Sequence, residues 1–259
     1  MKNNAKAIVF FDLDGTLLTR DIKVADSTVK AVKKLRENNI LPIIATGRSL
    51  FEIEHIMQHT GINSIVSMNG QSVIFEGKPI FSNDIDPQII DRILQFSHSE
   101  TGIPIAFYND YIMRISELGE PATKFYHYLQ QAIPPVDDKI HYQEPIQMLL
   151  LLCESGEEIY RDVFPELSFV RNTPYCVDVI NAKSSKAFGI KKLLQKAPLQ
   201  NIPTYAFGDG FNDIEMFEIV DHPIAMANAV TPLKQLAEFI TDDNNHDGIV
   251  KGLQRAGLI

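Results

Sequence analysis

The sequence predicts an α/β fold in which a doubly wound parallel sheet carries an inserted α+β domain. Apolar runs such as residues 7–11 do not alternate with polar residues, which is typical of strands buried on both faces of a parallel sheet. Strands alternate with helices near both ends of the chain, and this order indicates right-handed crossovers between parallel strands. The alternation stops over residues 84–181 and then resumes. We therefore predict one core domain formed by residues 1–83 and 182–259, with residues 84–181 inserted as a second domain.

The first part of the core is predicted from apolar runs and amphipathic spacing. Asp26 or Ser27 is expected to cap the first helix, and Gly61 to end the second. A hairpin is expected where a Glu-Gly-Lys turn separates two short strands. The expected elements are a strand at 7–11, a helix at 26–38, a strand at 40–45, a helix at 50–59, a strand at 64–67 and a hairpin at 71–82.

The insertion and the second part of the core differ in pattern. The insertion mixes short strands with helices and contains no D-x-D or glycine-rich phosphate loop. Its expected elements are helices at 86–98, 121–131 and 156–164 and strands at 104–108, 111–115, 147–153, 168–171 and 176–180. The core then continues with helices at 185–196, 208–220, 232–237 and 248–255 and strands at 204–207, 223–226 and 239–241.

Composition limits the partners of the protein. The net charge of −9 argues against a nucleic-acid surface, because such surfaces neutralise phosphates with lysine and arginine. No apolar run approaches the ~20 residues of a membrane-spanning helix, and the run that follows Lys6 is too short for a signal peptide. Cys153 and Cys176 lack metal-ligand spacing, so we expect two reduced thiols and no disulfide. These features predict a cytoplasmic protein that binds neither nucleic acid nor membranes.

Two carboxylates follow the first strand. Asp12 and Asp14 lie where the strand at 7–11 ends, and open α/β sheets bind their ligands at this edge. Gly15 permits a sharp turn, and Thr16 could cap the segment that follows. Taken alone, the D-x-D-G sequence is equally consistent with a polar turn after a buried strand.

A second acidic group follows a later strand of the core. In the sequence G-D-G-F-N-D, Asp209 and Asp213 come after the strand at 204–207, so both should reach the same sheet edge as the first two carboxylates. Four carboxylates repel one another unless a cation lies among them, and Mg²⁺ is bound by carboxylates, waters and substrate phosphates. Helix capping explains either residue of the second group singly, but not two acidic groups at strand ends.

Two further positions indicate phosphate binding. Thr46 and Gly47 follow the strand at 40–45 and offer a hydroxyl and unhindered N–H groups at a helix start, although a plain turn explains a T-G pair better when the pair is taken alone. Lys186 opens the helix after the insertion, where the helix dipole disfavours a cation. A lysine at such a position indicates a separate role, whereas neighbouring Lys183 is expected to be a solvated loop residue.

Taken in order, these four pieces resemble the motifs of the haloacid dehalogenase-like (HAD) phosphohydrolase superfamily. They are D-L-D-G-T, the T-G pair, the lysine at a helix start and G-D-G-F-N-D. The position of the insertion, N-G at 69–70, M-A-N-A at 226–229 and D-G at 247–248 resemble the Cof-type subgroup, so the likeness spans the chain. Ala187 is a departure, because that subgroup usually has glycine after the lysine. The resemblance implies a HAD-like, Rossmann-like core and identifies residues 84–181 as a cap domain.

The resemblance implies catalytic roles for the acidic residues. Asp12 would be the nucleophile that attacks phosphorus and forms an aspartyl-phosphate. Asp14 would protonate the leaving alkoxide and then deprotonate the attacking water. Mg²⁺ would be held by the Asp12 carboxylate, the backbone carbonyl of Asp14 and Asp209. Asp213 would support metal-bound water or Lys186, and whether it is itself a metal ligand stays open.

The resemblance also implies a phosphate site and an activity. The phosphoryl oxygens would be held by Thr46, Lys186, Asn212 and the N–H groups of Leu13 and Gly47. The implied activity is Mg²⁺-dependent hydrolysis of a small phosphorylated metabolite, with a sugar phosphate as the expected substrate and the cap closing as a lid. A phosphomutase or phosphotransferase would use the same aspartyl-phosphate, and a non-catalytic metabolite-binding regulator could keep the fold. We expect a monomer or a weak homo-oligomer.

Other polar residues have simpler interpretations. The His55 and His59 pair lies on a helix without a third metal ligand, so we interpret it as a polar helix face. Arg48 follows the T-G pair and is expected either to contact phosphate or to form an ion pair. Three polar residues of the insertion could face the substrate but are expected to be exposed turn residues: Asn109, Asp110 and Arg114.

Overall fold

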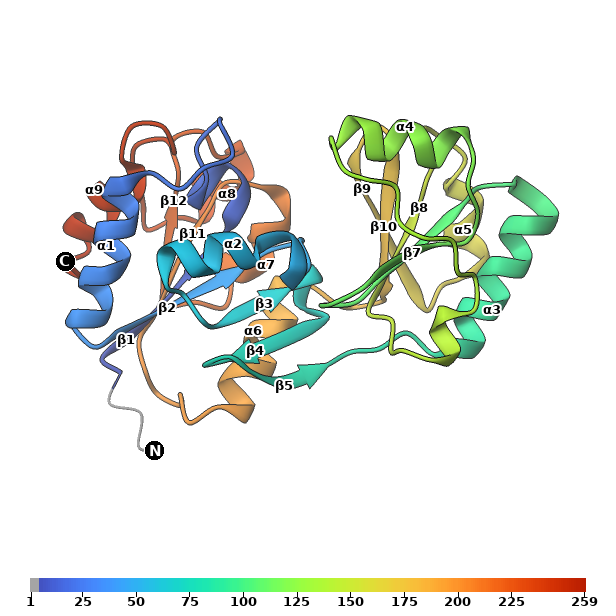
Figure 1. Cartoon of the computed structure of the whole chain (residues 1–259). Coiled ribbons are helices and arrows are strands. Elements are labelled where there is room, and N and C mark those ends of the chain that lie inside the picture. The colour runs from blue at the N-terminus through green and yellow to red at the C-terminus, as the bar shows by residue number, and fades with distance from the viewer. Residues whose placement is uncertain (1–4) are drawn as a thin grey trace. The chain divides into compact units, whose positions relative to one another are not determined.

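The chain folds as two compact units. The computed structural model describes residues 5–259 (Figure 1). The first unit contains residues 5–81 and Ser185–Ile259, and the second unit is Ser82–Ser184. No helix among residues 5–259 is long and apolar enough to cross a membrane.

The first unit is built on one mostly parallel sheet. Its strand order is β13-β12-β11-β1-β2-β3-β4-β5, in which neighbours from β13 to β3 run parallel and β4 pairs antiparallel with β3 (Figure 1). The strands are β1 (Ala7–Phe11), β2 (Ile40–Ala45), β3 (Ile65–Ser67), β4 (Ser72–Phe75), β5 (Lys78–Ser82), β11 (Thr204–Gly208), β12 (His222–Ala225) and β13 (Phe239–Ile240). β1 lies inside the sheet between β2 and β11, which is why its five residues are all buried and all apolar.

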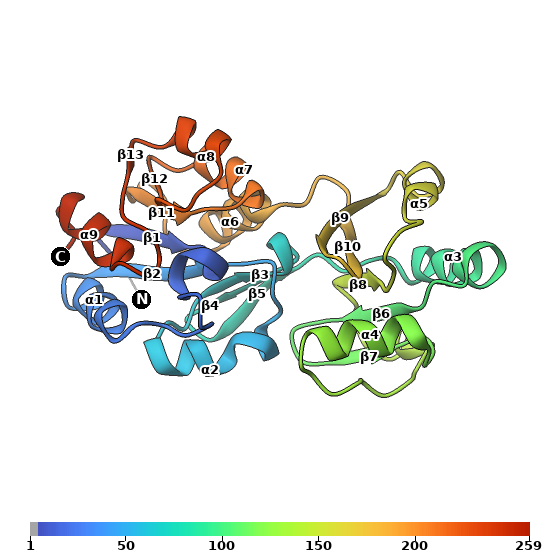
Figure 2. The ribbon, with the colours of Figure 1, turned by 90° about the horizontal axis from the view of Figure 1, so that it is seen from above.

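Helices cover both faces of this sheet, as a doubly wound fold requires. One face carries α1 (Asp26–Glu37), α2 (Leu50–Thr60) and α9 (Gly248–Arg255). The other carries α6 (Lys186–Lys196), α7 (Ile214–Phe217) and α8 (Thr231–Leu236), as Figure 2 shows. Alternate residues of β1 serve the two cores, with Val9 and Phe11 facing the first group of helices and Ile8 and Phe10 the second. The predicted fold class is therefore confirmed.

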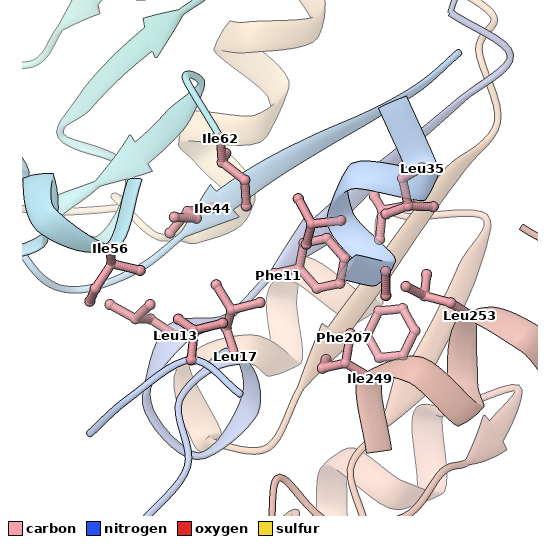
Figure 3. Packing of buried hydrophobic residues seen from close by; sticks show 14 of the residues in the cluster. Phe11, Leu13, Leu17, Leu35, Ile44, Ile56, Ile62, Phe207, Ile249 and Leu253 are labelled. Carbon is pink, nitrogen blue, oxygen red and sulfur yellow. The ribbon is translucent and has the colours of Figure 1, made fainter. Parts of the chain in front are cut away.

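One of these cores lies directly behind the ends of β1 and β11 (Figure 3). The rings of Phe11 and Phe207 stack with their centroids 5.4 Å apart, and burying each ring stabilises the fold by about 1.5–3 kcal/mol. Leu13 and Leu17 follow β1 and are almost fully buried in the same core. They fix the backbone of the turn that leaves the strand, and the acidic residues of this turn are thereby held in place.

The second unit has an antiparallel sheet with strand order β7-β6-β8-β10-β9. The strands are β6 (Ile105–Tyr108), β7 (Met113–Ile115), β8 (Met148–Leu151), β9 (Leu167–Thr173) and β10 (Cys176–Asn181), and the helices are α3 (Pro87–Phe96), α4 (Glu120–Tyr128) and α5 (Glu158–Val163). Apolar side chains of α3 and α5 share one core with β6, β8 and β10. Cys153 and Cys176 are buried thiols that form no disulfide bond, as predicted.

Two helix ends differ from the prediction. α1 begins at Asp26, and its N-cap is Ala25, which cannot cap through its side chain. The Ser27 hydroxyl instead donates a hydrogen bond to Oδ1 of Asp247 at 2.5 Å. The side chain expected to cap the helix is therefore bonded to a residue near the other end of the chain. The helix expected at 208–220 is also shorter, because it consists of a single 3₁₀ turn, Phe211–Asp213, followed by α7.

The prediction of exposed turn residues in the insertion was wrong for Asn109, Asp110 and Arg114. Arg114 is half-buried and lies within β7, and the exposed fractions of Asn109 and Asp110 are only 4% and 6%. The Asn109 side chain accepts hydrogen bonds from the N–H groups of Tyr111 and Ile112, both at 2.8 Å, and donates to the carbonyl of Pro145 at 3.0 Å. An Asn side chain that mimics a backbone turn in this way is buried by the turn it builds.

Candidate active site

The first acidic residue of the site is fixed by the strand that precedes it. β1 ends at Phe11, and the N–H of Asp12 continues the sheet by donating to the carbonyl of Phe207 at 2.9 Å. One wide helical turn, Leu13–Leu17, follows and bends the chain away. Gly15 in this turn has φ +81°, and a Cβ there would lie 2.3 Å from Oδ2 of Asp209. Glycine is needed at this position, because the turn packs directly against a carboxylate of the neighbouring strand end.

Three carboxylates meet at this edge of the sheet. β1 and β11 are parallel neighbours with Phe11 opposite Phe207, so the residues that follow them emerge side by side. Oxygen atoms of Asp12, Asp209 and Asp213 all lie within 4.8 Å of one another. Asp12 and Asp213 are almost fully buried. The structure therefore brings together three of the four carboxylates that we expected to converge.

A buried lysine faces two of these carboxylates. Lys186 is the first residue of α6, and its ammonium donates to Oδ1 of Asp12 and, at 2.7 Å, to Oδ1 of Asp213. Its side chain is fully buried. Burial alone would lower the pKa of Lys186, but the two carboxylates outweigh burial and raise it, so Lys186 stays charged. Two anions thus offset the cost of placing the Lys186 cation at the start of a helix. Neighbouring Lys183 is exposed, as predicted for a loop lysine.

Asp12 experiences the opposite balance. Burial raises the pKa of the Asp12 carboxyl well above its ordinary value, and the nearby Asp213 raises it further, while Lys186 lowers it. The cluster contains three carboxylates, and the ammonium of Lys186 pairs with only two of them, which leaves an excess of negative charge around Asp12. A further cation near Asp12 would favour its ionised form.

Asp213 uses its oxygens inside the protein. Oδ2 accepts from the N–H groups of Asp209 and Gly210 at 2.9 and 3.0 Å, and Oδ1 accepts from Lys186. The side chain is fully buried. Asp213 therefore holds the turn after β11 and orients Lys186. Because it accepts these three hydrogen bonds, Asp213 has fewer lone pairs left for a metal ion than Asp12 or Asp209.

Two residues orient Asp209. The Thr16 hydroxyl donates to Oδ1 at 2.8 Å, and the Asn228 amide lies 3.3 Å from Oδ2 while donating to the carbonyl of Gly15 at 2.9 Å. Thr16 thus contacts the second acidic group. The alternative that its hydroxyl caps the segment that follows is not the arrangement found. Asn228 was not predicted as a site residue. It lies in the M-A-N-A sequence, which was noted as a family resemblance, but that sequence gives no chemical reason to place an asparagine beside Asp209.

Asp14 lies apart from the cluster of three carboxylates. Its side chain is 55% exposed and pairs with Arg48, whose Nε donates to Oδ2 at 2.9 Å and whose Nη2 donates to Oδ1. Burial alone would lower the pKa of Arg48, but the hydrogen bonds that Arg48 donates to the Asp14 carboxylate raise it. Of the two alternatives considered for Arg48, the ion pair is the one present.

The T-G pair forms a loop next to another strand end. Thr46 follows β2 and is 1% exposed; its hydroxyl accepts from the N–H of Arg48 at 3.1 Å, and its carbonyl accepts from the N–H of Asn69 at 3.0 Å. A Cβ on Gly47 would lie 3.2 Å from the Asn69 amide. α2 begins only at Leu50, behind a capping box, so the pair precedes the helix and does not open it.

The remaining predicted site residues differ in exposure. The Leu13 side chain is fully buried in the apolar core, so only its backbone N–H group is a candidate for binding phosphate. Asn212 is exposed, and its amide lies 3.5 Å from Oδ1 of Asn69, the residue that also borders Gly47. Asn69 therefore links the loop after β2 to the turn after β11.

The donor set of the site fits a hard divalent cation. Three carboxylates with oxygen atoms within 4.8 Å of one another offer ligands of the kind that Mg²⁺ prefers, and their combined charge exceeds that of Lys186, which pairs with two of them. Within residues 5–259, this is the one cluster of histidine, cysteine and acidic side chains close enough to hold a metal. His55 and His59 are exposed and outside it, in agreement with a polar helix face.

Comparisons with known proteins agree with this geometry. A family model described as haloacid dehalogenase-like hydrolase matches residues 9–253. YkrA of Bacillus subtilis, which is named provisionally as a phosphatase, is 36% identical over 97% of this chain and 98% of its own length. A crystal structure of a hypothetical protein from Geobacillus kaustophilus is 38% identical, with a TM-score of 0.92 over 98% of this chain and 100% of that one. The structure of the sugar phosphatase BT4131, described as HAD subclass IIB, is 25% identical, with a TM-score of 0.81 over 98% of this chain and 100% of its own.

Proposed function

The chain belongs to the haloacid dehalogenase-like hydrolase family, and we propose that it is a Mg²⁺-dependent phosphatase that hydrolyses a small phosphorylated metabolite through an aspartyl-phosphate on Asp12. Phosphatase-named relatives that cover almost the whole chain support the phosphatase activity. The observation that carries the rest is the Asp12 carboxylate at the end of β1, which Lys186 holds and which lies beside Asp209.

Asp12 is suited to act as the nucleophile. It lies at the end of a rigid, buried strand, and Lys186 fixes one of its oxygens, so the carboxylate has little freedom to lose on reaction. Because burial raises the pKa of Asp12, an ionised nucleophile needs cations nearby. Lys186 is one of them. Mg²⁺, with Asp12, Asp209 and the Asp14 carbonyl as its proposed protein ligands, would neutralise charge between nucleophile and phosphate.

The reaction would take place in two displacements. In the first, an Asp12 oxygen attacks phosphorus, the bond to the leaving oxygen breaks, and Asp14 gives that oxygen a proton. In the second, Asp14 takes a proton from a water molecule that attacks phosphorus, and the bond between phosphorus and Asp12 breaks. The products are an alcohol and inorganic phosphate, and Asp12 is again a carboxylate.

The phosphoryl oxygens would be held by donors around the strand ends. We assign this role to the Thr46 hydroxyl, the N–H groups of Leu13 and Gly47, Lys186 and Asn212. Phosphoryl transfer depends mainly on positioning and on stabilisation of charge, and these groups supply both.

We assign the second unit as the cap that selects the substrate, and we propose a sugar phosphate as that substrate. The name of BT4131 supports this class, while other relatives are named as phosphatases of HMP-PP and of a ribitylaminouracil phosphate. A panel of sugar phosphates and these other phosphorylated compounds would identify the class by its kcat/KM.

We place the protein in the cytoplasm. Neither of its two cysteines forms a disulfide bond, which agrees with a reducing compartment.

The decisive experiment is hydrolysis of p-nitrophenyl phosphate by the Asp12→Asn variant with Mg²⁺. We expect turnover to fall by at least about 10³-fold, because asparagine has no nucleophilic carboxylate. A matched control is Asp242→Asn, which removes an exposed carboxylate paired with Lys251 in the same unit. Activity of Asp12→Asn near that of the wild type would overturn the proposal. Phosphate release that persists in EDTA would overturn the metal requirement, and conversion of a sugar phosphate to its isomer would identify a mutase.

A further inference from the structure

We propose that Arg48 is a positioning residue that holds the Asp14 carboxylate in the resting enzyme and releases it when substrate phosphate binds. The incoming phosphate would take the Arg48 guanidinium as its own partner, and Asp14 would then be free to reach the leaving group. This inference rests on the proposed function, since it assumes that Asp14 transfers the proton and that phosphate binds beside Thr46.

The resting position of Asp14 is defined by the ion pair. Nε and Nη2 of Arg48 donate to different oxygens of Asp14, so the guanidinium grips both sides of the carboxylate. Asp12, Asp209 and Asp213 gather without Asp14. The carboxylate assigned to proton transfer is therefore held by an arginine and not by the site's buried lysine.

This ion pair is placed where it can be exchanged. The Asp14 side chain is 55% exposed and that of Arg48 is 29% exposed. Pairs at such exposure change an equilibrium constant by only about three- to fivefold, so another anion can replace the carboxylate. Asp213, by contrast, is fully buried with its lysine and is not available for such an exchange.

Arg48 also belongs to the loop that we assign to phosphate. Its N–H donates to the Thr46 hydroxyl at 3.1 Å, and its carbonyl accepts from the N–H of Met68 at 3.0 Å. These backbone contacts hold the base of the side chain two residues from Thr46 without help from the guanidinium. The guanidinium fork matches phosphate as well as carboxylate, and a phosphate dianion attracts it more strongly than a single carboxylate does.

The competition predicts a measurable coupling between two residues. Calorimetric titration with inorganic phosphate and Mg²⁺ would compare the wild type, Asp14→Asn, Arg48→Gln and the double variant. Asp14→Asn should strengthen phosphate binding in the wild type, because Arg48 no longer has to leave a carboxylate. In the Arg48→Gln background the same change should strengthen binding about three- to fivefold less, because no ion pair is left to break.

Simple repulsion between Asp14 and phosphate gives a different result. Repulsion alone would make Asp14→Asn strengthen binding by the same factor in both backgrounds, and that outcome overturns the proposal. Arg48→Lys keeps the charge but loses the fork, so its coupling should be intermediate. Arg92→Gln is the matched control, because it removes an arginine–carboxylate pair of the second unit, with Glu166 at 2.6 Å, and should leave phosphate affinity unchanged.

Steady-state kinetics separate release from productive positioning. If Arg48 only restrains Asp14 and then binds phosphate, Arg48→Gln should raise KM about five- to tenfold and change kcat by less than about threefold. A large fall in kcat with KM unchanged would instead show that the observed ion pair is the productive arrangement, and would overturn the release.

A failure of the proposed function would look different. Thr46→Val should weaken phosphate binding if phosphate lies where we assign it, and wild-type affinity in that variant would place the error in the phosphate site. If Thr46→Val does weaken phosphate binding but the effects of Asp14→Asn and Arg48→Gln on phosphate affinity are additive, then the proposed release of Asp14 is refuted and the proposed function is not.

Discussion

Replacing Lys186 by methionine should destabilise the first unit strongly. Its ammonium contacts Asp12 and lies 2.7 Å from Oδ1 of Asp213, and the side chains of Lys186 and Asp213 are both fully buried. Methionine fills a similar volume but leaves two carboxylates facing each other out of contact with water. Removing one partner of a buried ion pair costs about 3–5 kcal/mol. For a unit of this size, the loss lowers Tm by roughly 6–20 °C. Thermal and urea unfolding in EDTA at neutral pH would measure it.

A second substitution tests the electrostatic cause. Adding Asp213→Asn to Lys186→Met should recover about half of the lost stability, because it removes one of the two uncompensated charges. The asparagine oxygen can still accept from the N–H groups that Asp213 now binds. Lys191→Met is the control, since Lys191 is exposed on the same helix and its loss should cost no more than about 0.5 kcal/mol. A Lys186→Met protein that melts with the wild type would refute the reasoning.

Three further predictions follow from other contacts. Mg²⁺ at a hundred times its Kd should stabilise the wild type by about 2.7 kcal/mol, and Asp209→Asn should lose most of this gain in a Tm titration. Gly70→Ala should cost at least about 2 kcal/mol in urea unfolding, because φ is +90° and a Cβ would lie 2.1 Å from the carbonyl oxygen of Ser185, whereas Gly77→Ala, at φ +74° in open space, should cost about 1 kcal/mol. Burial raises the pKa of Asp12 above its unfolded value. In EDTA, the contribution of Asp12 to the free energy of unfolding is therefore present at low pH and is lost as the pH rises through the raised pKa. The Asp12→Asn variant should lack this part of the pH dependence of the urea midpoint.

Much of the fold could be predicted because burial leaves a direct pattern in the sequence. The strand at Ala7–Phe11 is apolar throughout since helices cover both faces of its sheet, and the break in the strand–helix order marks the second unit. Helix ends were less predictable. α1 lacks the expected side-chain cap because Ser27 bonds with Asp247, which is distant in sequence, and no local pattern records such a contact.

The gathering of Asp12 and Asp209 could also be predicted, since neighbouring parallel strands end at the same edge of a sheet. The position of Lys186 at the start of α6 was visible as an electrostatic anomaly, a cation at the wrong end of a helix. The sequence did not show that Asn228 orients Asp209, nor that Asn109 is buried by its own turn. Both depend on backbone groups brought near by other segments.

The layered α/β architecture and the family could be inferred from the amino-acid sequence alone, and so could three of the acids at one edge of the sheet, although the expected fourth, Asp14, lies apart from them. The partners of these acids became visible only in the folded chain: Asp213 accepts from Lys186 and backbone N–H groups, Asp209 from Thr16 and Asn228, and Asp14 pairs with Arg48. The reason is physical. Strand order and hydrophobic burial follow from local composition, whereas the partner of a carboxylate depends on side-chain direction and on residues far away along the chain.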